Sequence, residues 1–209
     1  MNRAEPLPTG PTGRTGPTGP SGPTGPSDPL GELARLFEGE GSAEYFGEAV
    51  TQAGHMLRAG ALAEAAGAPG HLVAAALLHD IGHFHGVVTG RDLMEGGQDN
   101  RHSHTGADWL GRWFGPEVTE PVRLHVAAKR YLCAVEPGYF ALLSEASVHT
   151  LRVQGGPMTA EQVRGFEALA GSADAVAVRR WDDRAKDPEM NVPDFDHFRP
   201  LLEKLLIRS

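Results

Sequence analysis

The residues of this chain with the clearest capacity for chemistry are a neighbouring histidine and aspartate, His79 and Asp80. They stand in the segment LLHDIGHF, on a predicted helix over residues 70–82 that is otherwise apolar nearly all round. Burying a carboxylate is costly unless a strong partner compensates its charge. A bound metal ion is such a partner, because adjacent imidazole and carboxylate groups can ligate one or two ions. The alternative is an ordinary core histidine beside a capping aspartate.

Four more histidine and aspartate side chains stand in other predicted helices and can join this pair. They are His55, His102, His125 and Asp182. With Asp80 as a bridge between two ions, the complete set offers four imidazoles and two carboxylates. Imidazole-rich sites favour iron, manganese or zinc over magnesium, which prefers oxygen ligands. We therefore expect a dinuclear metal site.

The elements that must position these side chains are all predicted to be helices. Asp28 and Pro29 are a favourable N-cap and first helical residue, and Ser42 is the expected N-cap of the second helix. No segment shows the alternation typical of a strand. We predict an all-α fold, a single helical bundle over residues 28–209. Its helices are expected at about 30–38, 43–66, 70–82, 102–114, 117–132, 137–152, 159–170, 172–184 and 194–207.

The N-terminal residues 1–27 differ in composition from the rest of the chain. Glycine recurs at every third position from Gly10 to Gly25, which is the period of a collagen triple helix. The run is short, and its polar composition is typical of a disordered segment. We predict a disordered tail over residues 1–27.

Composition and charge exclude several classes of partner. The net charge is −8, whereas a nucleic-acid-binding surface requires clustered lysine and arginine. No apolar run approaches the length of a membrane span, and residues 1–10 contain no apolar stretch typical of a signal peptide. The single cysteine, Cys133, excludes an intramolecular disulfide and is compatible with a reducing compartment. We expect a cytoplasmic protein with no nucleic-acid or membrane partner; the oligomeric state stays open.

The order of His55, His79-Asp80 and Asp182 is the pattern that names the HD superfamily. Longer segments over about residues 40–207 resemble one group within it, the HD-domain mixed-valent di-iron oxygenases that cleave carbon–phosphorus bonds. The resemblance is carried by YFGEAVTQAGH (45–55), LLHDIGH (77–83), HSHTGADWL (102–110), HVAAKRYL (125–132), LSEASVHTLRVQGGPM (143–158) and RRWDDRAK (179–186).

This resemblance implies a particular assignment of ligands and cofactors. The cofactors would be two iron ions, as a mixed-valent Fe(II)/Fe(III) pair, with O2 as co-substrate. His102 is preferred to His104 because its spacing to Gly106 matches the family. The first iron would be held by His55, His79, Asp80 and Asp182, and the second by Asp80, His102 and His125.

The resemblance also implies roles for residues around the metals. Tyr45 and Glu48 would stand at the substrate entrance, and one continuous helix over 43–66 would place both on the face of His55. His83 would join them as a catalytic residue beside the substrate. The phosphonate would be bound by Lys129, Ser147 and Arg179.

The implied substrate is a small 1-hydroxyphosphonate, either 2-amino-1-hydroxyethylphosphonate or its N-trimethyl analogue. The products would be inorganic phosphate and glycine or glycine betaine. The first alternative is an HD-type metal-dependent phosphohydrolase, which would use the metals to activate water. The second is a non-enzymatic HD module, which the presence of all six ligands disfavours. A requirement for oxygen separates the oxygenase from the hydrolase.

Overall fold

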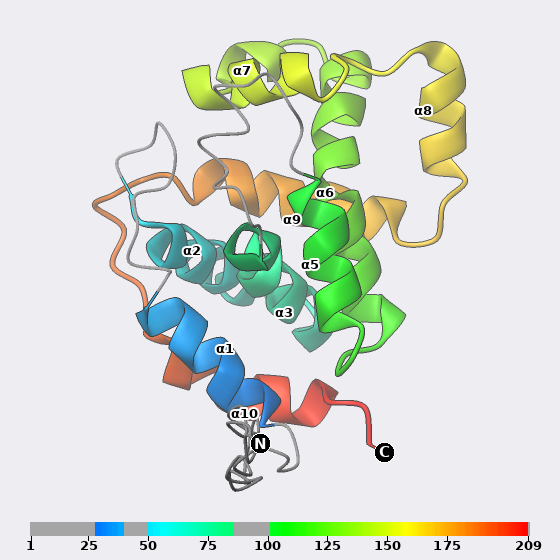
Figure 1. Cartoon of the computed structure of the whole chain (residues 1–209). Coiled ribbons are helices and arrows are strands. Elements are labelled where there is room, and N and C mark those ends of the chain that lie inside the picture. Colours follow the sequence, from blue (N-terminus) through cyan, green and yellow to red (C-terminus); the bar gives the residue numbers. More distant parts are fainter. Residues whose placement is uncertain (1–27, 40–49, 86–100, 209) are drawn as a thin grey trace, which may run out of the picture.

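The computed structural model describes residues 28–39, 50–85 and 101–208, and the regular elements in these ranges are helices, with no strand among them (Figure 1). The all-α prediction is therefore confirmed. No helix within these ranges has the length and apolar character needed to cross a bilayer. The helices are α1 (Pro29–Glu38), α2 (Gln52–Ala65), α3 (Gly70–Leu78), η2 (Ile81–His85), α5 (His102–Leu110), α6 (Pro116–Val135), η3 (Tyr139–Leu142), α7 (Glu145–Val153), α8 (Ala160–Glu167), α9 (Ser172–Arg184) and α10 (Phe195–Leu205).

Helix α2 begins nine residues later than the apolar spacing predicted. Thr51 has an extended backbone (φ −78°, ψ 158°), and its hydroxyl accepts a hydrogen bond from the amide of Gly54 at 3.1 Å. Thr51 is therefore the N-cap, and the first helical residue is Gln52. The prediction of one continuous helix over 43–66 is wrong, because the chain is extended at Thr51, and the predicted N-cap Ser42 lies outside the described residues.

Tyr45 and Glu48 lie outside the described residues, as does the predicted tail over 1–27. No single helix carries all of Tyr45, Glu48 and His55 on one face, because the chain is not helical at Thr51. The roles expected of Tyr45 and Glu48 stay predictions.

Helix α3 is the central element, and every residue from Leu72 to Leu78 is buried. Helices α2, α6, α9 and α10 pack around it. Its small alanines let neighbours approach, and Gly60 of α2 comes so close that an added Cβ would lie 3.1 Å from the Cβ of Leu77. Each buried leucine contributes about 1.5–3 kcal/mol by leaving water. Packing therefore fixes the end of α3 that leads into His79.

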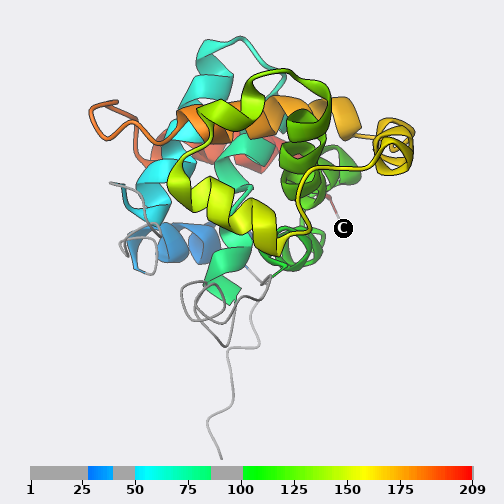
Figure 2. The same cartoon turned by 90° about the horizontal axis from the view of Figure 1, so that it is seen from above.

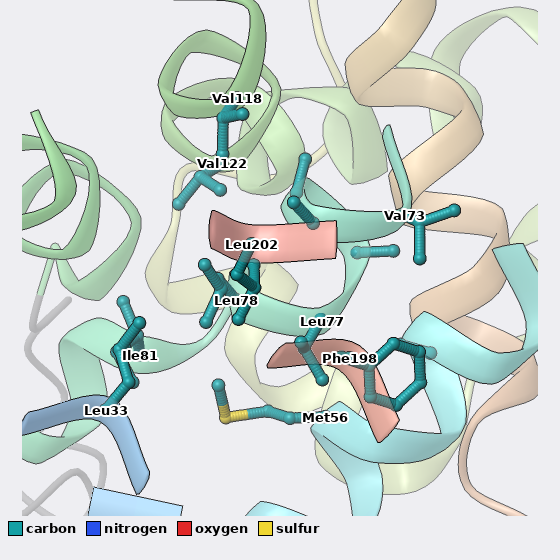
Figure 3. Packing of buried hydrophobic residues seen from close by; sticks show 14 of the residues in the cluster. Leu33, Met56, Val73, Leu77, Leu78, Ile81, Val118, Val122, Phe198 and Leu202 are labelled. Atoms are coloured by element: carbon teal, nitrogen blue, oxygen red, sulfur yellow. The ribbon is translucent and has the colours of Figure 1, made fainter. Parts of the chain in front are cut away.

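Figure 3 shows the apolar cluster that surrounds this helix. Leu77 and Leu78 of α3 lie in it with Met56 of α2 and with Phe198 and Leu202 of α10, all of them fully or almost fully buried. Helices that are far apart in sequence therefore share one core, which aligns α2 with the end of α3.

The remaining helices extend this core in three directions. At one end of the molecule α1 packs against α10, where the rings of Phe37 and Phe195 are 4.9 Å apart (Figure 1). At the opposite end α7 lies beyond α6, and α8 stands at the side in both views (Figures 1 and 2). Helix α9 packs against α2, α3 and α6. A side chain from this C-terminal part of the sequence can therefore reach the centre of the bundle.

The short helix η2, which follows the His79-Asp80 turn, packs directly against the start of α5. A Cβ added to Gly82 would lie 2.0 Å from the carbonyl oxygen of His102 and 2.8 Å from the amide nitrogen of Gly106. A Cβ on Gly106 would in turn lie 3.0 Å from the amide nitrogen of Gly82. Only glycine allows backbones to approach this closely. The contact sets the separation of the His79-Asp80 turn from His102.

Because Gly82 makes this contact and Gly165 makes none, the two glycine-to-alanine substitutions should change stability in opposite directions. Gly82→Ala should lower the free energy of unfolding by about 1–3 kcal/mol, because the added methyl group meets backbone atoms. Gly165→Ala, in α8, is the matched control. It meets nothing within 4 Å and should raise the free energy of unfolding by about 0.5–1 kcal/mol. Denaturant titrations measure both values. Equal stability of the two variants would contradict the predicted backbone contact.

Candidate metal centre

Four of the six predicted ligands meet in one buried cluster, the first cluster, formed by α2, the turn after α3 and α9. His55 Nε2 lies 3.2 Å from both His79 Nε2 and Asp182 Oδ1. Asp80 Oδ2 lies 3.4 Å from His79 Nε2 and 3.8 Å from His55 Nε2. Atoms that bind one ion at about 2.0–2.2 Å stand about 3 Å apart when their bonds are perpendicular. The spacing of the first cluster therefore fits a single metal ion.

The other oxygen of Asp80 faces a second cluster. Asp80 Oδ1 lies 3.3 Å from His102 Nε2 and 3.4 Å from His125 Nε2. The two imidazole nitrogens are 3.2 Å apart. His83 Nε2 is also within 3.8 Å of Asp80 Oδ1, and its ring stacks on that of His102 with centroids 4.1 Å apart. The second cluster thus contains three predicted ligands and one further imidazole.

Asp80 belongs to both clusters, with one oxygen in each, as a bridging carboxylate requires. Gln52 helps to hold it, because its side-chain amide donates to Asp80 Oδ2 at 3.3 Å. Gln52 is buried at the first position of α2, three residues before His55. The sequence interpretation missed Gln52, although that spacing places both side chains on neighbouring positions of one helix.

The orientation of two imidazoles is set by backbone carbonyl groups. His79 Nδ1 lies 2.8 Å from the carbonyl oxygen of Ala76, and His125 Nδ1 lies 2.8 Å from that of Val122. A carbonyl oxygen only accepts, so Nδ1 donates its proton and Nε2 is the nitrogen that faces the cluster and can bind a metal. This second hydrogen bond is the usual way in which a protein fixes the tautomer of a metal-binding histidine.

The electrostatics of the clusters favour a bound cation. Burial alone would lower the pKa of His79, but the charges of Asp80 and Asp182 raise it to about 9. Asp182 Oδ1 is buried and accepts no hydrogen bond of suitable geometry from the described chain. A metal ion would satisfy this oxygen and balance the two carboxylates. The donor set of imidazole and carboxylate suits a transition metal, so the residues fit two such ions.

Two imidazoles of the second cluster, those of His83 and His125, are kept in the neutral form. Burial lowers the pKa of His125 to about 4 and that of His83 to about 3. Both side chains are therefore neutral at physiological pH, and neutral imidazole is the ligand form.

A set of polar side chains lies near the two clusters, where α6 faces α7. Lys129 of α6 is 3% exposed and donates to Thr150 Oγ1 at 2.7 Å. Lys186, just beyond α9, donates to Ser147 Oγ at 2.7 Å and to Ser144 Oγ at 3.0 Å. We call these five residues the lysine–hydroxyl cluster. It includes two of the predicted phosphonate ligands, Lys129 and Ser147. In total it offers two ammonium groups and three hydroxyls, a combination suited to an anion.

Arg179, the third predicted phosphonate ligand, is buried among carboxylates. Its Nη1 donates to Asp182 Oδ2 at 2.7 Å, and its Nε donates to Asp183 Oδ2 at 3.2 Å. Burial and the charge of Arg179 lower the pKa of Lys129 to about 7. The structure therefore brings Arg179 to a metal ligand as well as near the lysine–hydroxyl cluster.

Three residues of this region were missed, two of them because their partners are distant in sequence. Lys186 stands in the quoted segment RRWDDRAK, but its contacts with α7 span about 40 residues. The contact of Tyr139 with Arg179 likewise spans 40 residues. Asp183 could have been found, because it stands four residues after Arg179 on one helix face.

The helical fold with paired histidine–aspartate clusters defines an HD-domain protein, and the family model described as the HD domain matches residues 53–155. Over 171 residues the chain is 45% identical to [1-hydroxy-2-(trimethylamino)ethyl]phosphonate dioxygenase (glycine-betaine-forming) of Leisingera caerulea, covering 82% of this chain and 87% of that protein. It is 42% identical over 167 residues to hydroxymethylphosphonate dioxygenase of Gimesia maris, covering 79% and 82%. The chain therefore belongs to the family of HD-domain phosphonate dioxygenases, which confirms the resemblance seen in its segments.

The shared carboxylate predicts different metal losses for different substitutions. After anaerobic loading with Fe(II) and desalting, the wild-type protein should hold close to two ions per chain. Asp80→Ala should disturb both clusters and leave well under one ion, whereas His125→Ala should leave about one. His197→Ala is the control, because His197 pairs with Glu64 on the surface, and it should keep two ions. Elemental analysis gives each value; saturation of the wild type with one ion would refute the dinuclear site.

Proposed function

We propose that this protein is a di-iron oxygenase that cleaves the carbon–phosphorus bond of a small 1-hydroxyphosphonate. The reaction is R–CH(OH)–PO3H2 + O2 → R–COOH + H3PO4, in which oxygen is the oxidant. The observation that carries the proposal is the Asp80 carboxylate shared by two imidazole-rich clusters. The names of the two dioxygenases to which the chain is 45% and 42% identical support it further.

Two iron ions, as a mixed-valent Fe(II)/Fe(III) pair, are the proposed cofactor. Iron supplies, when bound, the one-electron chemistry with oxygen that protein side chains lack. His55, His79, Asp80 and Asp182 would hold the first ion, and Asp80, His102 and His125 the second. The second cluster offers fewer protein atoms, which leaves room for substrate as a catalytic metal site requires.

His83 is the proposed catalytic side chain at the second cluster. Its Nε2 faces Asp80 Oδ1 at 3.8 Å, and its low pKa keeps the ring neutral. A neutral Nε2 can accept a hydrogen bond from the C1 hydroxyl of the substrate, which would orient the C1–H bond. Tyr45 and Glu48 are proposed to complete this side of the site at the substrate entrance.

The phosphonate is proposed to bind at the lysine–hydroxyl cluster. Lys129 stands one turn after His125 on α6, so one helix offers a metal ligand and a cation to the same small molecule. Lys186 adds a second ammonium group, and the hydroxyl of Ser147 beside it could donate to a phosphonate oxygen. Charge-assisted hydrogen bonds of this kind are about twice as strong as neutral ones.

The substrate class follows from what the two named relatives have in common. One name carries a trimethylamino group and the other has no amine, but both describe a phosphonate with a hydroxyl on its carbon. That shared group is what the second cluster and the lysine–hydroxyl cluster would recognise. Both 2-amino-1-hydroxyethylphosphonate and its N-trimethyl analogue belong to this class. The identities favour this function over that of an HD-type phosphohydrolase.

The proposed function predicts that phosphate release depends on oxygen. Iron-loaded protein should release phosphate from hydroxymethylphosphonate, 2-amino-1-hydroxyethylphosphonate or its N-trimethyl analogue only in the presence of O2. One O2 should be consumed for each phosphate, as the balanced reaction demands. Equal rates under strict anaerobiosis, or turnover confined to phosphate esters, would assign the protein to the hydrolases. His125→Ala, which should lack the second ion, serves as the inactive control.

Lys129 predicts a pH-dependent contribution to substrate binding. Lys129→Ala should keep its iron and weaken anaerobic substrate binding by about 10- to 150-fold, the equivalent of a charge-assisted hydrogen bond of about 1.5–3 kcal/mol. A lysine is charged below its pKa, which is about 7 here. The ratio of mutant to wild-type dissociation constants should therefore be large at pH 6 and fall as the pH rises above 7.

The same substrate is used for both proteins, so its own ionisation cancels from this ratio. Lys204→Ala, at an exposed position of α10, should give a ratio near one at every pH. A ratio for Lys129→Ala that is close to one at pH 6 would show that Lys129 does not bind the phosphonate.

A further inference from the structure

The guanidinium group of Arg179 is bound by oxygens of the protein through all three of its nitrogens. Its Nη1 donates to Asp182 Oδ2 at 2.7 Å, its Nε donates to Tyr139 Oη at 3.1 Å and to Asp183 Oδ2 at 3.2 Å, and its Nη2 donates to Asp183 Oδ1. Each of the three nitrogens therefore has a protein acceptor. Arg179 is 4% exposed, so these protein contacts are buried and little of its surface faces outward.

The two oxygens of Asp182 have different surroundings. Oδ2 accepts from Arg179, whereas Oδ1 points to His55 Nε2 at 3.2 Å and His79 Nε2 at 3.8 Å. A carboxylate with one oxygen bound in this way cannot rotate about its Cβ–Cγ bond without breaking a charge-assisted hydrogen bond. The Arg179 contact therefore fixes the orientation of the carboxylate and leaves one oxygen facing the first cluster.

Arg179 is in turn held by residues outside the metal clusters. Asp183 binds two of its nitrogens with two oxygens, the bidentate geometry that suits the planar guanidinium group. The Tyr139 hydroxyl contacts both Arg179 and Asp183, and Tyr139 belongs to η3, between α6 and α7. Burial alone would lower the pKa of Arg179, but Asp182 and Asp183 raise it above its ordinary value. The group is therefore a permanent cation fixed in space.

We propose that Arg179 is a positioning residue for the first metal site, which holds Asp182 with Oδ1 toward the ion and is itself held by Asp183 and Tyr139. This role rests on the metal-binding part of the proposed function. It differs from the phosphonate contact that the family resemblance predicts for Arg179. In the proposed site the substrate anion faces the ammonium groups of Lys129 and Lys186, and the Asp182 contact gives the guanidinium group a role at the metal that does not depend on substrate.

The two roles of Arg179 make opposite predictions about metal and substrate. Substitution of residues that orient metal ligands typically costs about 10- to 100-fold in metal affinity. Fe(II) affinity is measured by competition with a chelator, without substrate or oxygen, in a His125→Ala background in which only the first cluster would bind iron. Arg179→Gln should lower the affinity by about 10- to 100-fold, and Arg179→Lys should restore part of it. Tyr139→Phe should lower it in the same direction by less.

Matched controls separate this role from substrate binding. Lys129→Ala and Lys186→Ala, made in the same background, should leave Fe(II) affinity unchanged, while in the otherwise wild-type protein they should raise KM. Arg179→Gln with unchanged Fe(II) affinity and a raised KM would overturn the proposal in favour of a phosphonate contact. Should Arg179→Gln fail to fold, Tyr139→Phe decides, since unchanged affinity there would also overturn it. A wrong substrate assignment would not alter these affinities, because substrate is absent from the measurement.

Discussion

The carboxylate of Asp80 has one oxygen in each of two imidazole clusters, and the rest of the structure depends on how it is held there. Asp80 follows the last residue of α3 by two positions, so the burial of Leu72–Leu78 fixes the point from which it projects. The contact of Gly82 with the start of α5 sets its separation from His102. Gln52 binds the oxygen that faces the first cluster. Core packing, a glycine contact and one amide thus determine whether a single carboxylate can serve two ions.

Such a centre places negative charge in the interior, and the protein has to balance it with nearby positive groups. Asp80 and Asp182 are 2% exposed, and their charges would destabilise the fold without positive partners nearby. Arg179 offers one such charge to Asp182, and two metal ions would offer the rest. The same helices that bury the ligands also carry Lys129 and lead into Lys186. Positive charge therefore lies on the side of the site where a phosphonate would bind, separate from the imidazoles that bind the metals.

The sequence predicted what depends on local pattern and missed what depends on distant contacts. The six predicted metal ligands, the apolar character of α3 and the Asp28 N-cap are visible in residue types and spacing, and the structure brings these six side chains together. The predicted start of α2 was wrong because both Ser42 and Thr51 are suitable N-cap residues, and helical periodicity alone does not decide between them. The surroundings of Arg179 could not be predicted, since its Tyr139 partner is 40 residues away. A charged residue next to a ligand can serve substrate or metal, and only its contacts distinguish these roles.

The central claim is that one carboxylate joins two metal ions, and anomalous X-ray diffraction at the iron absorption edge tests it most directly. Crystals of protein loaded anaerobically with Fe(II) should show two iron peaks, one beside His55, His79 and Asp182 and the other beside His102 and His125. One Asp80 oxygen should be bound to each ion. A single iron peak, or both Asp80 oxygens on the same ion, would contradict the account.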